Sequence, residues 1–402
     1  MSLLLTLISL VLYAVGLFLL FNVLYLLFFA LAGHWKQAPL APLEKAPAAF
    51  QRMCVLIPAY HADAVILETA PAAKRHAYPG QMQVHVIADG LQPATVAKLR
   101  SQNIGVIEVA FEKSTKGKAL LVALQTLPAE SYDVAVVLDV DNVMDTGFLT
   151  EVNRAFAAGY RVVQGHRTAK NVDSPFAVLD ACNEEINNHI FRQGHASLGM
   201  SAALIGSGMA FEYGYFKQLL QDIGDTPGED KEMDFRIVKD GVKIAYLPNS
   251  YVFDEKIPNS KAFTTQRTRW IAAQLEFLKK YFWEGPVQLW RGNGEFFDKV
   301  LQTLLVPRIL LLGVLGLFLL LSLPGWPAGP PTLFWAGLLL GTGMSLLISL
   351  PGRMYNRQVG QAIWHLPIAL GAMVIALLQT KKAKTSFLPT PHATTSAEAA
   401  QH

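Results

Sequence analysis

Charged residues are almost absent from two parts of the chain, residues 2–32 and 309–378, whereas the part between them carries an ordinary share of charge. The first of these stretches is interrupted only by Asn22, two hydroxyl residues and small side chains. A helix of about 20 residues is long enough to cross a bilayer. The pattern therefore predicts a transmembrane helix over residues 1–33.

Between residues 50 and 255, short apolar runs alternate with segments of helical periodicity. Alternation of this kind indicates an α/β domain whose mostly parallel sheet is covered by helices on both faces. Ligands of such sheets bind beyond the carboxyl ends of the strands, so polar residues at those ends are candidates for a functional site. The predicted strands are 53–57, 83–88, 104–109, 134–138, 161–163 and 243–247, and the clearest predicted helices are 118–126, 146–158, 175–193 and 229–239.

The last third of the chain predicts helices at or in a membrane. An amphipathic pattern comes first, and a helix of this kind can lie in the membrane interface. Three apolar stretches follow, each near the lower length limit for a span, and then a Ser/Thr/Ala-rich tail. The predicted segments are interfacial helices over 256–300, transmembrane helices over 301–380 with apolar stretches at 309–323, 333–350 and 363–378, and a disordered tail over 385–402.

The basic residues near these segments bear on the topology. Three of them between residues 36 and 52 favour the cytosolic side for the α/β domain, as expected for an integral protein of a bacterial inner membrane. One span before the domain and three after it would put the tail outside, yet the lysines between 381 and 384 favour the inside. One late segment is therefore expected to be re-entrant or interfacial, and 309–323, which follows Pro307, is the candidate.

Charge and cysteine content exclude other classes of function. The net charge is only +3 and the basic residues form no stripe with interleaved aromatics, so no nucleic-acid partner is expected. Cys54 and Cys182 have no metal-ligand spacing and are expected to be core thiols of a reducing compartment.

Two aspartates at a strand end carry the strongest local signal. Asp139 and Asp141 follow the predicted strand 134–138, and residues two apart in an extended segment point to the same side. A divalent cation such as Mg²⁺ or Mn²⁺ prefers oxygen ligands and commonly shares them with a diphosphate. A solvated turn is the alternative interpretation, because Asp and Asn favour turns.

Two earlier segments are candidates for nucleotide contacts. Asp89 ends the predicted strand 83–88 and can accept hydrogen bonds from a base or ribose, although an Asp-Gly turn is the simpler interpretation of this pair alone. Lys116 and Lys118 lie at the start of a predicted helix, where backbone N–H groups and lysines favour an anion such as a diphosphate. A capped helix with solvated lysines explains the same residues.

Two later segments supply candidate acid–base and sugar contacts. Glu229 and Asp230 begin the predicted helix 229–239, where a carboxylate can act as a general base, although acids also stabilise helix N-termini without any further role. Arg269 can hold a diphosphate with paired hydrogen bonds, and Trp270 offers a flat face to a sugar ring. An interfacial helix with an anchoring Trp and Arg is the alternative for that pair.

The order of these segments resembles glycosyltransferase family 2 over residues 53–270. The chain is most similar to the membrane-bound branch that includes cellulose, hyaluronan, chitin and poly-N-acetylglucosamine synthases and ceramide glucosyltransferase. Only one span precedes the domain, where several of the processive synthases have two. The matching segments are Val55–Tyr60 as the first strand, Asp89, Lys116-Gly117-Lys118, Asp139 and Asp141, Gly206-Ser207-Gly208, Glu229-Asp230, and Gln266, Arg269 and Trp270.

The resemblance implies a GT-A fold and an inverting transfer from a UDP-sugar donor with the help of Mg²⁺ or Mn²⁺. It implies that the acceptor is a polysaccharide or a lipid, at a membrane whose lipids the protein contacts. The implied roles are donor contacts for Asp89, Lys116, Lys118, Asp139, Gln266, Arg269 and Trp270, metal ligation by Asp139 and more directly Asp141, and general-base catalysis by Asp230 with Glu229 beside it.

Three functions follow as hypotheses. The first, and the one that the resemblance favours, is a synthase for an exopolysaccharide, with secretion partners as an open possibility. The second is an enzyme that transfers one sugar to a lipid. The third is an inactive membrane scaffold, which is disfavoured because every acidic position that the chemistry requires is present.

Overall fold

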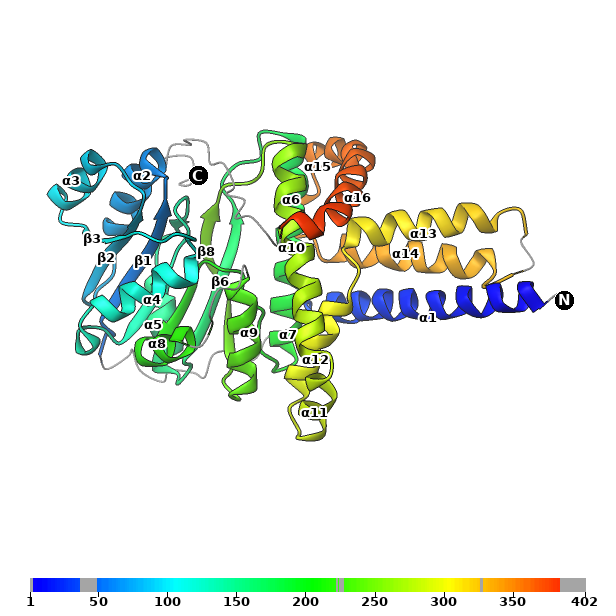
Figure 1. Cartoon of the computed structure of the whole chain (residues 1–402), viewed down its shortest axis with the longest axis horizontal. Coiled ribbons are helices and arrows are strands. Elements are labelled where there is room, and N and C mark those ends of the chain that lie inside the picture. The colour runs from blue at the N-terminus through cyan, green and yellow to red at the C-terminus, as the bar shows by residue number, and fades with distance from the viewer. Residues whose placement is uncertain (1–2, 37–48, 222, 224–227, 326–327, 384–402) are drawn as a thin grey trace.

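The computed structural model describes the chain except residues 1–2, 37–48, 222, 224–227, 326–327 and 384–402. An α/β unit forms one half of the molecule, and a bundle of apolar helices projects from it (Figure 1). The tail for which the sequence predicts disorder lies outside the described residues.

A single mixed sheet of eight strands forms the centre of the α/β unit, in the order β3-β2-β1-β4-β7-β6-β8-β5. Neighbouring strands are parallel except at β7, which is antiparallel to both β4 and β6, and at β5, which is antiparallel to β8. The sequence prediction of an α/β fold with a mostly parallel sheet is confirmed. The strands are β1 Met53–Tyr60, β2 Met82–Asp89, β3 Gly105–Val109, β4 Val134–Val137, β5 Val143–Met144, β6 Val162–Ala169, β7 Met209–Glu212 and β8 Ile244–Asp254.

Helices cover both faces of this sheet, as the buried side chains of β1 illustrate. Because successive side chains of a strand point to opposite faces, Cys54 and Leu56 join one core cluster, while Val55 and Ile57 join the other. The first cluster is completed by α4, α8 and α9, and the second by α2, α3 and α5. These helices are α2 Asp63–Lys74, α3 Pro93–Ser101, α4 Lys116–Thr126, α5 Phe148–Ala157, α8 Tyr213–Gln221 and α9 Glu229–Lys239.

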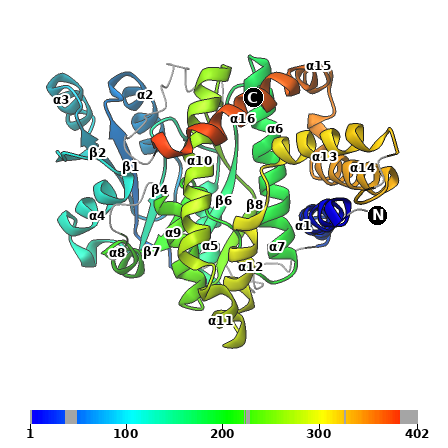
Figure 2. The ribbon, with the colours of Figure 1, turned by 45° about the vertical axis from the view of Figure 1, so that its right-hand side comes forward.

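A second layer of helices connects the α/β unit to the apolar bundle. In Figures 1 and 2 the long helix α10 runs past the edge of the unit, with α6 and α12 beside it. These elements are α6 Pro175–Asn187, which continues as a π-helix over Asn188–Gly194, α7 His195–Ser197, α10 Ser260–Tyr281, α11 Glu284–Trp290 and α12 Gly294–Leu304.

The projecting bundle consists of α1 Leu3–Ala32, α13 Arg308–Ser322 and α14 Thr332–Ile348 (Figure 1). A buried apolar cluster that includes Leu26, Leu311 and Trp335 joins the three helices. By length and composition, Leu3–Ala32 and Arg357–Thr380 are each able to cross a membrane, and α12 with α13 forms a third, bent candidate. The chain ends in α15 Arg357–Ala362 and α16 Leu366–Ala383.

The sequence predicts an irregular segment at 309–323, and the structure shows where the irregularity lies. α12 and α13 meet at an angle of 57°, on either side of Pro307. Beyond this bend, however, α13 packs beside α14 in the bundle. The apolar helix α16 packs mainly against α10 (Figure 2) and also contacts the start of α13.

Candidate active site

The candidate site forms where β1, β2 and β4 end, as the parallel topology predicts. Asp89 is the last residue of β2, is buried, and accepts a hydrogen bond from the Ser114 hydroxyl. Asp139 and Asp141 follow β4 in the turn that leads to β5. The structure therefore brings the ends of β2 and β4 to one edge of the sheet, with the segment before α4 beside them.

Lys116, the first residue of α4, is the centre of the cluster. Its Nζ forms an ion pair with Asp139 and donates a hydrogen bond of 2.6 Å to the carbonyl oxygen of Gly206. Burial acts to lower the pKa of Lys116, but the nearby carboxylates, above all Asp139, raise it overall. Lys116 is therefore a stable cation that joins α4, the turn after β4 and the glycine turn before β7.

Lys118 lies differently from Lys116. Its backbone N–H donates to the Thr115 hydroxyl, which caps α4, and its Nζ donates to the Lys113 carbonyl oxygen at 3.3 Å on the exposed side of the helix start. These two contacts of Lys118 are both with the start of α4 and the segment before it. Its role in binding a donor stays a prediction, with less geometric support than that of Lys116.

Asp141 is held more rigidly than Asp139. It is buried, and its two oxygens accept hydrogen bonds from the Glu255 backbone N–H at 3.1 Å and from the Asn142 amide at 3.2 Å. The same amide donates to Asp254 at 3.1 Å. Asp139 keeps about a third of its side chain exposed, at 32%.

The chemistry of these side chains fits a hard divalent cation. Asp139 and Asp141 offer carboxylate oxygens, the ligands that Mg²⁺ and Mn²⁺ prefer. No group of three or more His, Cys, Asp or Glu side chains is arranged to hold a metal ion within the described part of the chain. An ion bound here would therefore need further ligands from a substrate such as a diphosphate, together with water.

A network of buried charges lies behind Asp139, and the sequence analysis did not single it out. Arg167 of β6 donates to Glu184 of α6 at 2.9 Å and lies 3.8 Å from both Asp139 and Asp254. Lys256 completes the network through contacts of 2.8 Å with Asp254 and 3.6 Å with Glu184. Burial would raise the pKa of Glu184 and Asp254, but the cations around them hold both pKa values below their ordinary range.

Glu229 and Asp230 begin α9, where Asp230 lies beside the glycine turn and Glu229 beside Gly117 of α4. A Cβ atom added at Gly206 would lie 3.4 Å from Oδ2 of Asp230, which leaves little room for a side chain. Gly206 also has a φ of +85°, a backbone conformation that glycine adopts without strain. Burial, and then the proximity of Asp230, raises the pKa of Glu229 to about 7. Burial likewise raises the pKa of Asp230, although the backbone N–H of Lys231 and the cations nearby oppose this.

The helix α10 brings Arg269 to the same cluster. Burial lowers the pKa of the Arg269 guanidinium, while the charges of Glu229 and Asp139 act to raise it, so both carboxylates lie within electrostatic range. Gln266, one turn earlier on the helix, has its side-chain oxygen buried with no hydrogen-bond partner among the described residues. Arg269 and Gln266 thus lie where a polar ligand between α10 and the strand ends could reach them.

Trp270 makes a contact that the sequence did not predict. The guanidinium carbon of Arg267 lies 4.1 Å from the centre of the Trp270 ring, and Arg267 in turn forms a buried ion pair with Asp180 of α6. Trp270 itself is 40% exposed. One contact of the ring is therefore structural, and stacking against a sugar stays a prediction.

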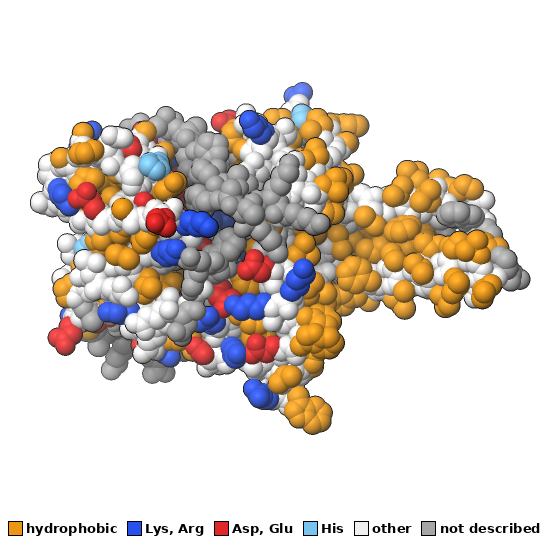
Figure 3. All heavy atoms as spheres, in the orientation of Figure 1, with side chains coloured by type: hydrophobic (Ala, Val, Ile, Leu, Met, Phe, Trp, Pro, Cys, Tyr) orange, Lys and Arg blue, Asp and Glu red, His pale blue; other side chains and the backbone are white. Residues whose placement is uncertain are grey.

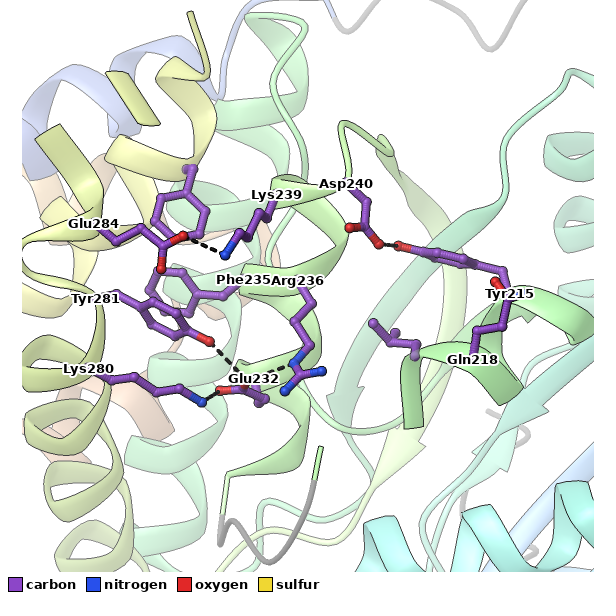
Figure 4. A pocket seen from close by; sticks show the side chains of 12 residues that line it. Tyr215, Gln218, Glu232, Phe235, Arg236, Lys239, Asp240, Lys280, Tyr281 and Glu284 are labelled. Carbon is purple, nitrogen blue, oxygen red and sulfur yellow. Dashed lines mark hydrogen bonds and ion pairs between the residues drawn. The ribbon is translucent and has the colours of Figure 1, made fainter. Parts of the chain in front are cut away.

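A separate cavity lies away from this cluster. It has a volume of about 710 Å³ and lies between α8, α9 and the helices α10–α12 (Figure 4). Its charged side chains are paired with one another: Glu232 accepts hydrogen bonds from Lys280 and Tyr281, and Lys239 pairs with Glu284. We therefore assign the chemistry to the cluster around Lys116 and not to this cavity.

Comparison with known proteins identifies relatives of this arrangement. The sequence profile of a family described as "Glycosyltransferase like family 2" matches residues 51–273. Among solved structures, the mannosyltransferase PcManGT from Pyrobaculum calidifontis in complex with GDP-Man and Mn²⁺ has 17% identity, with a TM-score of 0.59 over 94% of this chain and 99% of its own. The glucosyl-3-phosphoglycerate synthase from Mycobacterium tuberculosis, with Mn²⁺, UDP and glucosyl-3-phosphoglycerate, has 17% identity and a TM-score of 0.37 over 60% and 85% of the two chains. No curated protein matches the sequence.

Proposed function

This chain belongs to glycosyltransferase family 2, and on that premise we propose that it transfers a sugar from a nucleotide-sugar donor to an acceptor at a membrane. The meeting of Lys116, Asp139 and Asp230 around the Gly206 turn carries this proposal. These residues are far apart in the chain, and the fold brings them to one place. A cation and two carboxylates with different surroundings suit a reaction in which a diphosphate leaves while a hydroxyl loses its proton.

We assign donor binding to the side of the cluster that faces the strand ends. Lys116, Arg269 and the side-chain amide of Gln266 would contact the diphosphate, and Asp89 the nucleoside. Asp139 and Asp141 would hold Mn²⁺ or Mg²⁺, which supplies positive charge to the leaving diphosphate when bound. The buried, hydrogen-bonded carboxylate of Asp141 and the partly exposed carboxylate of Asp139 support the assignment of these two residues to the metal ion.

We assign the general base to Asp230, with Glu229 as its partner. The acceptor oxygen would form a bond to the anomeric carbon as the bond from that carbon to the diphosphate oxygen breaks, and the acceptor's proton would pass to the Asp230 carboxylate. Attack from the face opposite the leaving group inverts the configuration. The raised pKa values of Glu229 and Asp230 support this role, because a base works best when its pKa lies near the operating pH.

For the donor we propose a UDP-sugar, which is the class that the sequence resemblance implies. A GDP-sugar is the alternative, because the Pyrobaculum enzyme was solved with GDP-Man. A panel of labelled UDP- and GDP-sugars, incubated with the purified protein and Mn²⁺, separates them by which nucleoside diphosphate is released. Release from a UDP-sugar is expected, and release from GDP-mannose alone would reject the UDP assignment.

For the acceptor we propose a lipid-linked group, which differs from the polysaccharide that the resemblance favours. A channel for a growing sugar chain needs a polar lining. The described interior of the bundle is packed with apolar side chains. The side-chain amide of the buried Asn22 donates a hydrogen bond to the Phe18 carbonyl and accepts one from the Val306 backbone N–H. This packing supports transfer of one sugar at the membrane surface over secretion through the chain's own helices.

The size of the product tests the acceptor. Purified protein in lipid vesicles is incubated with the labelled donor, and the products are separated into solvent-extractable lipid and high-mass material. A single labelled lipid band is expected. High-mass product that glycosidases digest would instead support polysaccharide synthesis, and the absence of donor hydrolysis or transfer with every donor would support an inactive scaffold.

A further inference from the structure

The helix α16 packs mainly against α10, on the catalytic side of the molecule, and also contacts the start of α13, where Leu310 joins the same cluster. Phe263 and Ile271 of α10 share a buried cluster with Ala369, Ala372 and Ala376 of α16. Figure 2 shows α16 running across α10, whereas α1, α13 and α14 project together.

The charged residues of α10 indicate that this helix lies outside the hydrocarbon core of the bilayer. The helix carries Arg267, which forms a buried ion pair with Asp180 of α6, and Arg269, which faces the acidic cluster. Ionised groups in the hydrocarbon of a bilayer are costly and rare. A helix that packs on α10 over two turns thus lies beside the polar unit, not across the hydrocarbon.

The two faces of α16 differ in side-chain size. Its inner face consists mainly of small residues, Ala369, Ala372 and Ala376, which are at most 5% exposed, with the larger Met373 beside them at 3%. Its outer face carries Ile368, Ile375 and Leu378, which are 56%, 47% and 76% exposed. Small residues let a helix pack closely, while a row of exposed large aliphatic side chains indicates an apolar surrounding on the other side.

The first helix fixes where the hydrocarbon region ends. At the base of the bundle, Tyr25 of α1 donates to Asp298 at 2.7 Å, and Asp298 also contacts His195 at 3.0 Å. The part of α1 that precedes Tyr25 is all apolar or small except for a few hydroxyl residues and Asn22, and from Leu3 it would be about 33 Å long, which matches a hydrocarbon core of about 30 Å. The polar network around Asp298 therefore marks the boundary on the catalytic side.

Exposed tryptophans also occur on or next to helices outside the bundle. Trp283 and Trp290 frame α11 and are 79% and 93% exposed, and Trp364, just before α16, is 84% exposed. Tryptophan is enriched at the membrane–water interface. Hydrophobic side chains also gather over the bundle and its base, while charged ones gather over the α/β unit (Figure 3).

We propose that α15 and α16 lie in the plane of the membrane interface on the side of the α/β unit, with the outer face of α16 against lipid. Only α1, α13 and α14, among the described helices, then cross the bilayer. The two crossings after the α/β unit, α13 and α14, return the chain to the side on which the unit lies. This topology removes the conflict with the lysines between residues 381 and 384, although α16 is long enough to span.

The arrangement has a consequence for the acceptor, which rests on the proposed function. Arg269 of α10 lies within electrostatic range of Glu229 and Asp139, and Phe263 and Ile271 of the same helix pack on α16. A helix is about 10 Å wide, so α10 and α16 together separate the acidic cluster from the lipid against the outer face of α16. An acceptor carried on a lipid headgroup therefore has to approach the cluster around these two helices and not through them.

Labelling of single cysteines from one side of the membrane tests the topology. In full-length protein with Cys54→Ala and Cys182→Ala, Arg357→Cys and Gln379→Cys mark the two ends of α15–α16, which are exposed. Glu108→Cys marks the α/β unit and Leu323→Cys the far turn of the bundle. In oriented vesicles, an impermeant maleimide is expected to label residues 357, 379 and 108 from one side and 323 from the other. Labelling of 357 and 379 from opposite sides would overturn the proposal.

A depth measurement tests whether the outer face meets lipid. A fluorophore on Ile375→Cys is expected to be quenched by lipids brominated near the headgroup, and one on Arg100→Cys, in α3, is not. An unquenched probe at 375 would place α16 in water and reject the lipid contact. Neither readout uses transfer activity, so an inactive protein with the expected labelling would reject the proposed function and leave this inference intact.

Discussion

The α/β unit and the apolar bundle bury polar groups in different ways. In the unit, charges are buried in networks: Arg167 is surrounded by Glu184, Asp254 and Asp139. In the bundle, a buried polar side chain such as Asn22 is satisfied by backbone groups. A substitution in the unit therefore leaves several partners uncompensated, whereas one in the bundle or on α16 changes mainly the packing. The predictions below test this difference.

The largest effect is expected at the general base. Asp230→Asn keeps the shape of the side chain and removes its ability to take a proton, so kcat should fall about 10²- to 10⁴-fold. Release of nucleoside diphosphate at saturating donor measures it. Glu108→Gln is the matched control, because Glu108 is an exposed carboxylate on β3. Equal activity in Asp230→Asn and the control would remove Asp230 from the mechanism.

The next effect concerns the cation. Asp141→Asn leaves the hydrogen bond from the Glu255 backbone possible but removes a charged ligand, so Mn²⁺ should bind about tenfold or more weakly, as is typical when a group that holds or orients an ion is lost. The signal of free Mn²⁺ in electron paramagnetic resonance measures binding without activity. Unchanged affinity would assign the ion to other residues.

The buried network should govern stability. Arg167→Met removes the cation among three carboxylates, and breaking a buried ion pair in this way costs about 3–5 kcal/mol. Arg100→Met, at an exposed ion pair, should cost no more than about 1 kcal/mol. Thermal unfolding in detergent compares the two. A similar loss in both variants would mean that the network contributes little.

A smaller effect on stability is expected where α10 packs against α16. Ala376 is fully buried there, and Ala376→Leu should destabilise the protein by about 1–3 kcal/mol through overpacking. Ile375→Leu, one residue earlier on the exposed face, should change stability by no more than about 0.5 kcal/mol. If both variants unfold at the temperature of the wild type, the packing of α16 on α10 is not as described.

The smallest effect is a pH dependence of stability. The pKa of Glu229 is raised in the folded state to about 7, so its contribution favours folding at low pH and is lost as pH rises from its unfolded pKa towards 7. Glu229→Gln is neutral throughout this range. The change in Tm on going from wild type to Glu229→Gln should therefore be more positive at pH 8 than at pH 5. The opposite order would contradict the raised pKa.

Local sequence patterns were enough to predict the strands that position the site. Buried runs followed by Asp89, Asp139 and Asp141 end at one edge of the sheet because parallel strands share a direction. The helix 229–239, with its acidic first turn, matches α9. The sequence prediction missed β7, whose four residues follow the glycine turn without a distinct pattern.

The buried network and the position of α16 depend on partners that are distant in sequence. Arg167 and Glu184 pair across two elements, and nothing near either residue indicates the other. The apolar stretch of α16 has the composition of a span, and only its packing on α10 distinguishes it. Trp270 matched a family motif, but its contact with Arg267 follows from the fold.

The central claim is that carboxylates from β4 and α9 converge on one bound nucleotide sugar. Anomalous diffraction at the manganese edge, from crystals of the full-length protein with Mn²⁺ and a nucleoside diphosphate, tests this most directly. The account predicts a manganese peak beside Asp139 and Asp141, with the diphosphate near Lys116 and its free end towards Asp230. A manganese peak or a diphosphate elsewhere, with Asp230 facing neither, would contradict it.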